Sequence, residues 1–194
     1  MLDVAQTLET LLKGYPRQVK LLKAARFEPP NQLYGMLQVT PGWSFDASQF
    51  APGELVELMS VPGEQVQENQ APVNHFTAVE AQIGYNQLAY VTLACMAQDG
   101  HFDGVTPLSL ETMNKKKFND MVIRTITHDF KAPFDGTKPF DAVFEVSSLK
   151  LKRTPSGVYM IARTKFSFDG DKAYGESVAA VRVHAYELKN PGSV

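Results

Sequence analysis

Polar side chains lie on one stripe of a segment that is otherwise apolar, between about residues 74 and 98. At about 100° per helical residue, several positions fall within about 60° of one another. They are His75, Val79, Gln82, Asn86 and Tyr90. A helix that is apolar on its other sides is expected to be buried, and buried polar groups are either hydrogen-bonded or used in function. The stripe is therefore the first candidate for a site.

The residue types on this stripe could bind and activate a carbonyl group. His75 stands at the start of the predicted helix, where unpaired backbone N–H groups and the positive dipole end could hold a carbonyl oxygen. His75 could act as a base or orient a group, and Asn86 could hold the carbonyl or a water. The alternative is structural: His75 bonds near the N-cap, while Gln82, Asn86 and Glu80 satisfy buried backbone groups or a second copy of the chain. Glu80 shares a second face with Gln87, and a structural role suits Glu80 best because a buried carboxylate needs a partner.

Other reactive side chains give weaker signals. Cys95 is the only cysteine, which excludes an intramolecular disulfide and a Cys-rich zinc site, and its apolar surroundings predict a buried hydrophobe. His128 and Asp129 lie on a predicted strand and face opposite ways, so they cannot act as an adjacent pair. The lysines at 115–117 are expected to form a solvated basic face, which could also meet phosphate groups or an acidic partner. We expect no metal site.

Periodicity and turn residues predict the elements before the stripe. A short amphipathic helix is expected over residues 2–13, because leucines recur at helical spacing and Gly14 then ends the pattern. A strand is expected over 33–39. Residues 42–73 are punctuated by three glycines and three prolines. Such an irregular connection is typical of a functional cover over a site.

The predicted helix over about 74–98 has Asn74 as its N-cap and ends at Gly100. At about 1.5 Å per residue it would span ~36 Å, enough to cross a whole domain. After a surface stretch over 100–117, β-branched and aromatic residues predict strands at 120–130, 140–152, 158–168 and 177–188. The turns between them are short, which implies antiparallel neighbours.

One arrangement satisfies both a long buried helix and a run of antiparallel strands. A highly curved sheet wrapped around a central helix buries the helix on every side, which is the α+β arrangement called the hotdog fold. The chain length fits a single domain over residues 1–194. Because such a sheet leaves an open edge, we expect a homodimer or a larger homo-oligomer.

Composition narrows the class of protein. The formal net charge of −2 argues against a general binder of nucleic acid or of membrane surfaces, which would carry a basic excess. Apolar runs stay near ten residues, short of the ~20 that a membrane span needs. The N-terminal residues lack the basic and apolar regions of a signal peptide. We therefore expect a cytoplasmic protein.

Two segments of the predicted helix carry a family resemblance: Asn74-His-Phe-Thr-Ala-Val-Glu80 and Tyr85-Asn-Gln-Leu-Ala-Tyr90. They resemble the FcoT-like acyl thioesterase family of single hotdog domains, and the similarity continues through Ser109-Leu-Glu, Met121-Val-Ile-Arg124 and Phe130-Lys-Ala-Pro133. The resemblance implies hydrolysis of long-chain fatty-acyl thioesters of coenzyme A or an acyl carrier protein. It implies no catalytic carboxylate, and no cofactor beyond the coenzyme A or phosphopantetheine of the substrate.

The resemblance also assigns residues. By position, the helix asparagine of the family is Asn86 and its N-terminal tyrosine is Tyr15. The family's asparagine two residues after the histidine is Thr77 here, and a tyrosine shortly before the histidine has no counterpart, with Asn69 nearest. The expected catalytic residues are thus His75, Asn86, Thr77 and Tyr15. The expected substrate-binding residues are Phe76, Val79, Gln82, Tyr90 and Glu80.

Other activities stay open within the same fold. Related enzymes add glycine to an enoyl-carrier-protein thioester, and dehydratases of this fold pair a histidine with an acid on a partner helix, a role that His75 and Glu80 could take in a dimer. A non-catalytic acyl-binding subunit is the alternative from a different class. A filled core beside Asn86 would favour it, whereas an acyl tunnel would favour an enzyme.

Overall fold

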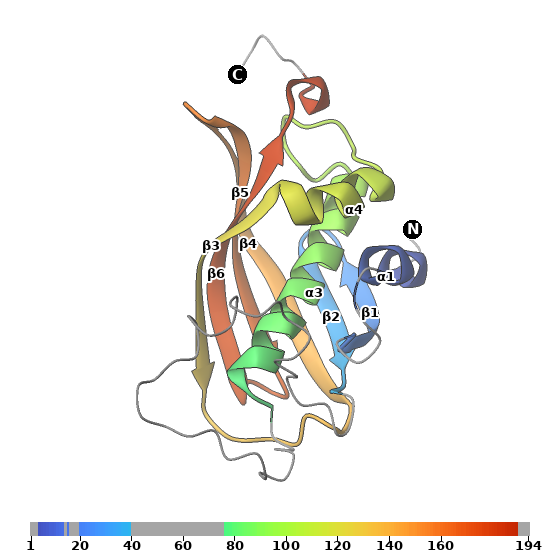
Figure 1. The fold of residues 1–194 in the computed structure, drawn as a ribbon, viewed down its shortest axis with the longest axis vertical. Coiled ribbons are helices and arrows are strands. Elements are labelled where there is room, and N and C mark those ends of the chain that lie inside the picture. Colours follow the sequence, from blue (N-terminus) through green and yellow to red (C-terminus); the bar gives the residue numbers. More distant parts are fainter. Residues whose placement is uncertain (1–3, 14, 16–19, 40–75, 190–194) are drawn as a thin grey trace, which may run out of the picture.

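A curved antiparallel sheet wraps around one long helix (Figure 1). The computed structural model describes residues 4–13, 15, 20–39 and 76–189. The strands follow one another in the sheet in the order β1-β2-β4-β5-β6-β3. The described elements are α1 (Val4–Leu12), β1 (Leu22–Glu28), β2 (Gln32–Leu37), α3 (Ala78–Gln98), α4 (Leu110–Asn119), β3 (Met121–Phe130), β4 (Phe140–Thr154), β5 (Gly157–Phe168), β6 (Ala173–Val183) and the short 3-10 helix η3 (Ala185–Glu187).

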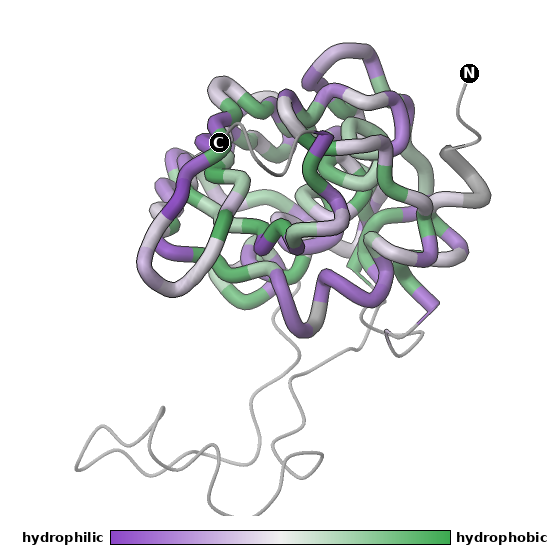
Figure 2. The backbone as a smooth tube through the Cα atoms, turned by 90° about the horizontal axis from the view of Figure 1, so that it is seen from above, coloured by the Kyte–Doolittle hydropathy of each residue, from purple (hydrophilic) through white to green (hydrophobic). Residues whose placement is uncertain are grey.

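The strands form because apolar and polar side chains alternate along them. On β5, Met160, Ala162 and Phe166 face the helix and are buried, while the intervening Arg163 and Lys165 are exposed. The turn that follows β5 uses the left-handed backbone, with positive φ at Asp169, Gly170 and Asp171, and so reverses the chain tightly into β6. Seen from above, hydrophilic stretches lie mostly on the outer turns of the chain (Figure 2).

Helix α3 is the centre of the core. Every residue from Val91 to Ala97 is buried, and the sheet approaches the helix most closely where glycines replace side chains. A Cβ on Gly84 would lie 2.9 Å from Leu37, and one on Gly35 would lie 2.8 Å from Leu88. Helices α1 and α4 pack on the same side of the sheet as α3 (Figure 1).

Several predicted boundaries differ from the observed ones. The stretch 100–117, expected to be an irregular surface, contains most of α4, whose N-cap Ser109 accepts a hydrogen bond from the Thr112 amide. The last strand begins at Ala173, earlier than predicted, and ends at Val183, where η3 follows. Residues 42–73, predicted to form a cover, lie outside the described residues.

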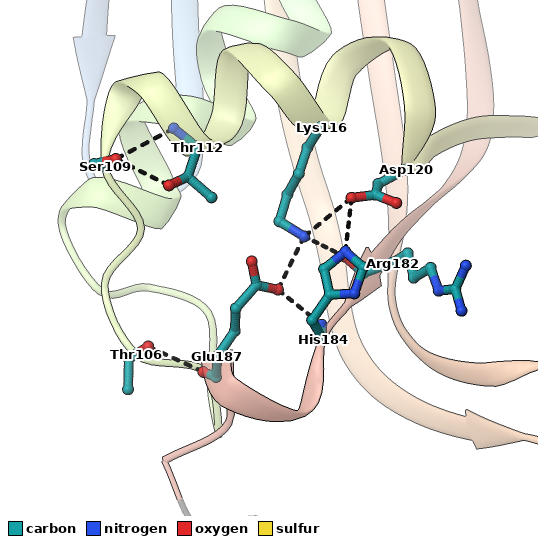
Figure 3. A network of polar contacts seen from close by, with 8 residues as sticks. All are labelled: Thr106, Ser109, Thr112, Lys116, Asp120, Arg182, His184 and Glu187. Atoms are coloured by element: carbon teal, nitrogen blue, oxygen red, sulfur yellow. Dashed lines mark hydrogen bonds and ion pairs between the residues drawn. The ribbon is translucent and has the colours of Figure 1, made fainter.

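The prediction of a solvated basic face at 115–117 was wrong for two of its three lysines. Lys115 is exposed, but Lys116 and Lys117 are buried. The Lys116 ammonium lies 2.9 Å from Glu187 Oε2 and 3.4 Å from Asp120 Oδ2, and it donates to the Arg182 carbonyl. Figure 3 shows these groups converging from α4 and η3. Buried charges of opposite sign therefore hold the chain after β6 against α4.

Candidate functional site

Side chains of the first turn cap the N-terminal end of α3. Thr77 is the N-cap: its hydroxyl accepts a hydrogen bond from the Val79 amide at 3.3 Å and donates one to the Glu80 carboxylate. Glu80 in turn accepts a hydrogen bond from the Thr77 amide at 2.9 Å. This reciprocal pair is a capping box. The N-cap of α3 is therefore Thr77 and not Asn74, three residues later than predicted, because the Thr77-x-x-Glu80 pattern fixes the start of the helix.

A pocket of about 410 Å³ lies beside this helix start, between α3 and the end of β3. Phe76, in its wall, is almost fully buried, and its ring packs 4.9 Å from that of Phe134 and 5.0 Å from that of Phe140. The pocket is lined by Phe76, Thr77, Ala78, Phe130, Lys131, Ala132 and Pro133. Lys131 is the only charged residue among these, and its ammonium lies 4.4 Å from the centre of the Tyr174 ring, so the pocket walls are mainly apolar.

The next turns of α3 carry a chain of hydrogen bonds that reaches the edge strand. The Gln82 side-chain nitrogen donates to Asn86 Oδ1 at 3.0 Å. His128 Nε2, from β3, lies 3.4 Å from Gln82 Oε1. All three side chains are half-buried. Burial lowers the pKa of His128, whose ring lies 5.2 Å from that of Phe166.

Sequence reasoning considered His128 only as a neighbour of Asp129. The two side chains do face opposite ways, as expected, since His128 contacts α3 while Asp129 is exposed. The signal that would have found the contact is the alternation Ile126-x-His128-x-Phe130, which places all three on one face of the strand. Sequence alone does not show that α3 lies over that face.

Two tyrosines meet further along α3. Tyr15 follows α1, where its amide donates to the Leu12 carbonyl at 3.1 Å. Its side chain is hydrogen-bonded to that of Tyr90, and burial together with this neighbour raises the pKa of Tyr15 well above its usual range. Burial also raises the pKa of Tyr90. Both phenols are therefore uncharged hydrogen-bonding groups at neutral pH and cannot act as bases.

Gln87, on the second polar face, has a structural role. Its Oε1 accepts hydrogen bonds from the amides of Leu21 and Leu22, at 3.0 and 2.9 Å, and the residue is completely buried. The start of β1 is thereby attached to the middle of α3. Within the described residues, no group of three His, Cys, Asp or Glu side chains could hold a metal ion. No described helix combines the length and the apolar character needed to cross a membrane.

A family model for FcoT-like thioesterase domains matches residues 70–185, which include the start of α3, the polar stripe and the edge strand. The chain belongs to this family. The six-stranded antiparallel sheet around α3 confirms the expected α+β hotdog fold of such a domain. No curated protein matches the sequence.

Solved structures resemble this FcoT-like domain at low identity. A thioesterase superfamily protein from Shewanella loihica PV-4 is 10% identical, with 89% of this chain and 98% of that chain covered and a TM-score of 0.45. A sigma28-regulated virulence protein from Campylobacter jejuni is 9% identical, with 93% and 90% covered and a TM-score of 0.45. The E. coli PaaI protein is 9% identical, with 79% and 73% covered and a TM-score of 0.35. These likenesses carry no argument about activity.

The residues that the family resemblance assigns do not gather at one point of this chain. Thr77 and Asn86 are nine positions apart, about 13 Å along the helix axis at ~1.5 Å per residue. Tyr90, which holds Tyr15, lies about 20 Å from Thr77 on the same scale. His75 lies outside the described residues. Three separate groups of polar side chains thus lie along α3: the capping box, the hydrogen-bonded set of Asn86 with Gln82 and His128, and the tyrosine pair.

Proposed function

We propose that this FcoT-like domain hydrolyses fatty-acyl thioesters of coenzyme A or of an acyl carrier protein. The family match over residues 70–185 carries the proposal, because it spans α3, its polar stripe and the pocket beside the helix start. In the reaction, a water oxygen bonds to the thioester carbonyl carbon, the C–S bond breaks, and one water proton ends on the leaving sulfur. The products are a fatty acid and a thiol. Coenzyme A or phosphopantetheine takes part only as a portion of the substrate.

Asn86 is the best placed of the described residues to meet the carbonyl. The groups at the helix start are engaged in the capping box, whereas Gln82 holds the Asn86 carbonyl end at 3.0 Å and leaves its amino group to donate. A donor aimed at the developing oxyanion is typically worth ~10²–10³ in rate. We therefore place the thioester carbonyl at Asn86 rather than at the helix start. His75 lies outside the described residues and is given no role at this carbonyl.

The pocket at the helix start then takes one arm of an extended substrate. Asn86 lies eight residues from Ala78, or about 12 Å along the axis, a distance that a pantetheine arm or an acyl chain can span. Phe76 and Phe130 would contact methylene groups, and Lys131 a negatively charged group. Val79, exposed between the pocket and Asn86, would line the path. Tyr15 and Tyr90 would bound the site at its far end.

We further propose that the domain works as a homodimer joined at β3. β3 is the last strand in the sheet order and exposes Val122, Ile123 and Phe130. An exposed apolar edge strand is a site for pairing with another chain. A second copy laid antiparallel along β3 would cover this edge and the half-buried side of α3. Light scattering on the Ile123→Lys variant tests the interface: we expect a monomer, and an unchanged mass contradicts this interface.

Thiol release from a panel of acyl-coenzyme A esters, short to long, tests the activity. Release that depends on chain length and needs no glycine supports hydrolysis. Release only from enoyl esters with glycine contradicts hydrolysis and indicates the amine-adding reaction. No release from any coenzyme A or carrier-protein ester contradicts an enzyme and favours an acyl-binding subunit.

Asn86→Ala, compared with the matched amide variant Asn114→Ala on α4, tests the placement of the carbonyl. We expect a fall in kcat of ~10²-fold or more for Asn86→Ala, with thermal unfolding unchanged. We expect wild-type turnover for Asn114→Ala. If Asn86→Ala instead mainly lowers the melting temperature, its role is structural.

A further inference from the structure

His128, on the edge strand β3, points toward the central helix α3. His128 pairs with Gly175 on β6, and its ring lies on the same strand face as Ile126. Its Nε2 atom is 3.4 Å from Gln82 Oε1, which is a long but direct hydrogen bond across to α3. The groups packed against the ring are Gln82 from α3, Phe166 from β5 and Phe130 from β3, none of which titrates.

The atoms in this chain of hydrogen bonds fix its direction. In this structure Gln82 Oε1 faces His128 and can only accept, so this arrangement requires the hydrogen on His128 Nε2. The Gln82 amino group then donates to Asn86 Oδ1 at 3.0 Å. The Asn86 carbonyl end is thus occupied, and its amino group faces away from Gln82. Within the part of the chain that the structure describes, no partner meets that amino group.

An asparagine side chain has nearly the same shape in both of its flipped orientations, so its neighbours decide which end faces a ligand. With the amino group outward, Asn86 donates to a carbonyl oxygen. With the ends exchanged, it would present its own oxygen and repel the carbonyl. Gln82 has the same ambiguity, which is removed only when His128 Nε2 carries a hydrogen and donates it to Gln82 Oε1.

We propose that His128 is a positioning residue that, through Gln82, orients the Asn86 side chain so that its amino group donates to the carbonyl oxygen of the bound thioester. This inference rests on the proposed function, because it takes Asn86 as the group that meets the carbonyl. His128 does not touch the substrate in this role. It acts across the gap between the edge strand and the helix, so the geometry of β3 controls the geometry of Asn86.

Protonation of the His128 ring distinguishes a positioning residue from a general base. Nε2 carries a hydrogen both in the neutral tautomer required here and in the imidazolium form, so the hydrogen bond to Gln82 survives protonation. A general base, by contrast, must be unprotonated. The effect of removing His128 is therefore the same above and below the lowered pKa of its ring if His128 positions Asn86, and it disappears below that pKa if His128 is a base.

The test uses two variants of the full-length protein that alter the chain of hydrogen bonds and retain the packing. His128→Phe keeps an aromatic ring but loses the donor. Gln82→Glu keeps the shape and still accepts from His128, but cannot donate to Asn86. Both should lower kcat about 10–100-fold with KM nearly unchanged, because a misdirected donor loses much of what a deleted one loses. Lys152→Gln, at an exposed site on β4 away from the proposed interface, should behave as the wild type.

A double-mutant cycle separates positioning from general structural support. In an Asn86→Ala background, His128→Phe should lower kcat no further, because the residue it orients is gone. An additional loss of the same size in that background overturns the proposal. So does a ratio of wild-type to His128→Phe turnover that falls to one as the pH drops below the pKa of the His128 ring.

A readout without turnover distinguishes this inference from the proposed function. The Asn86 side-chain NH2 signals can be assigned in a ¹⁵N spectrum by their absence from Asn86→Ala. They should shift in Gln82→Glu and in His128→Phe, but stay in place in Lys152→Gln. Unshifted signals overturn the positioning role even if the wild type is an active thioesterase. Shifted signals in a protein that releases no thiol support the orientation of Asn86 but refute the hydrolytic function, and with it the carbonyl contact.

Discussion

Replacing Lys116 by methionine should be among the most destabilising single changes in the chain. Methionine keeps the length of the side chain but removes the ammonium that lies 2.9 Å from Glu187 Oε2 and 3.4 Å from Asp120 Oδ2. The Glu187 side chain is only 2% exposed, so its charge would remain in the interior without a cation. Removing one partner of a buried ion pair typically lowers the free energy of unfolding by about 3–5 kcal/mol. For a domain of this size, the melting temperature should fall by roughly 6–20 °C.

Urea unfolding at fixed protein concentration measures this loss. Lys115→Met is the matched control, because its ion pair with Glu111 is exposed and screened by solvent, so its loss should leave the free energy of unfolding nearly unchanged. Adding Glu187→Gln to Lys116→Met removes the unpaired charge and should recover more than half of the loss. A loss under about 1 kcal/mol for Lys116→Met, or a double variant no more stable than the single one, refutes the reasoning from buried charge.

The same cluster predicts a pH dependence. Burial opposes ionisation of Asp120, but the hydrogen bond with His184 and the charge of Lys116 outweigh it and lower the pKa of Asp120. A carboxyl group whose pKa is lower in the folded state stabilises the fold above its ordinary value of 3.8. That stabilisation is lost as the pH falls through the lower folded value. In Asp120→Asn, the free energy of unfolding should therefore depend less on pH in this acidic range, as acid titration of the two proteins would show.

Two further predictions concern buried groups on α3. Gln87→Leu leaves the Leu21 and Leu22 amides without their acceptor, so the free energy of unfolding measured in urea should fall by about 2–4 kcal/mol. A fall of less than about 1 kcal/mol would mean that other acceptors replace Gln87. Burial, with Asp99 nearby, raises the pKa of Cys95 to about 12. The native protein should therefore not react with a thiol reagent at pH 8, whereas the urea-unfolded protein should react at once. Rapid labelling of the native protein would contradict the buried position.

The sequence predicted the elements better than their ends. The long helix and the later strands follow from periodicity, which is a local property of the chain. The start of α3 was also readable, because Thr77-x-x-Glu80 is a capping-box pattern, but Asn74 was preferred as the N-cap. Helix α4 was missed because its buried face is built partly from Lys116 and Lys117, whose burial depends on partners distant in sequence.

The site was predictable only in part, for the same reason. Helical spacing brought Gln82 and Asn86 onto one stripe, and they are hydrogen-bonded to each other. His128 joins them only because β3 pairs with β6 and α3 crosses that face, which no local pattern encodes. Tyr15 reaches Tyr90 through the packing of α1 against α3. Thr77 and Asn86, both among the expected catalytic residues, stand nine positions apart along the helix.

The sheet order also has a consequence for how the chain is made. Helix α3 is synthesised before β4, β5 and β6, the strands whose inner faces bury it. Strand β3 likewise leaves the ribosome before β6, the strand with which it pairs from Met121 to Phe130. A nascent chain stalled after α4 therefore carries the long helix α3 with most of its cover still to be translated. Burial of α3 cannot be complete before β6 is synthesised, so the exposed apolar side chains of α3 are an aggregation hazard until then.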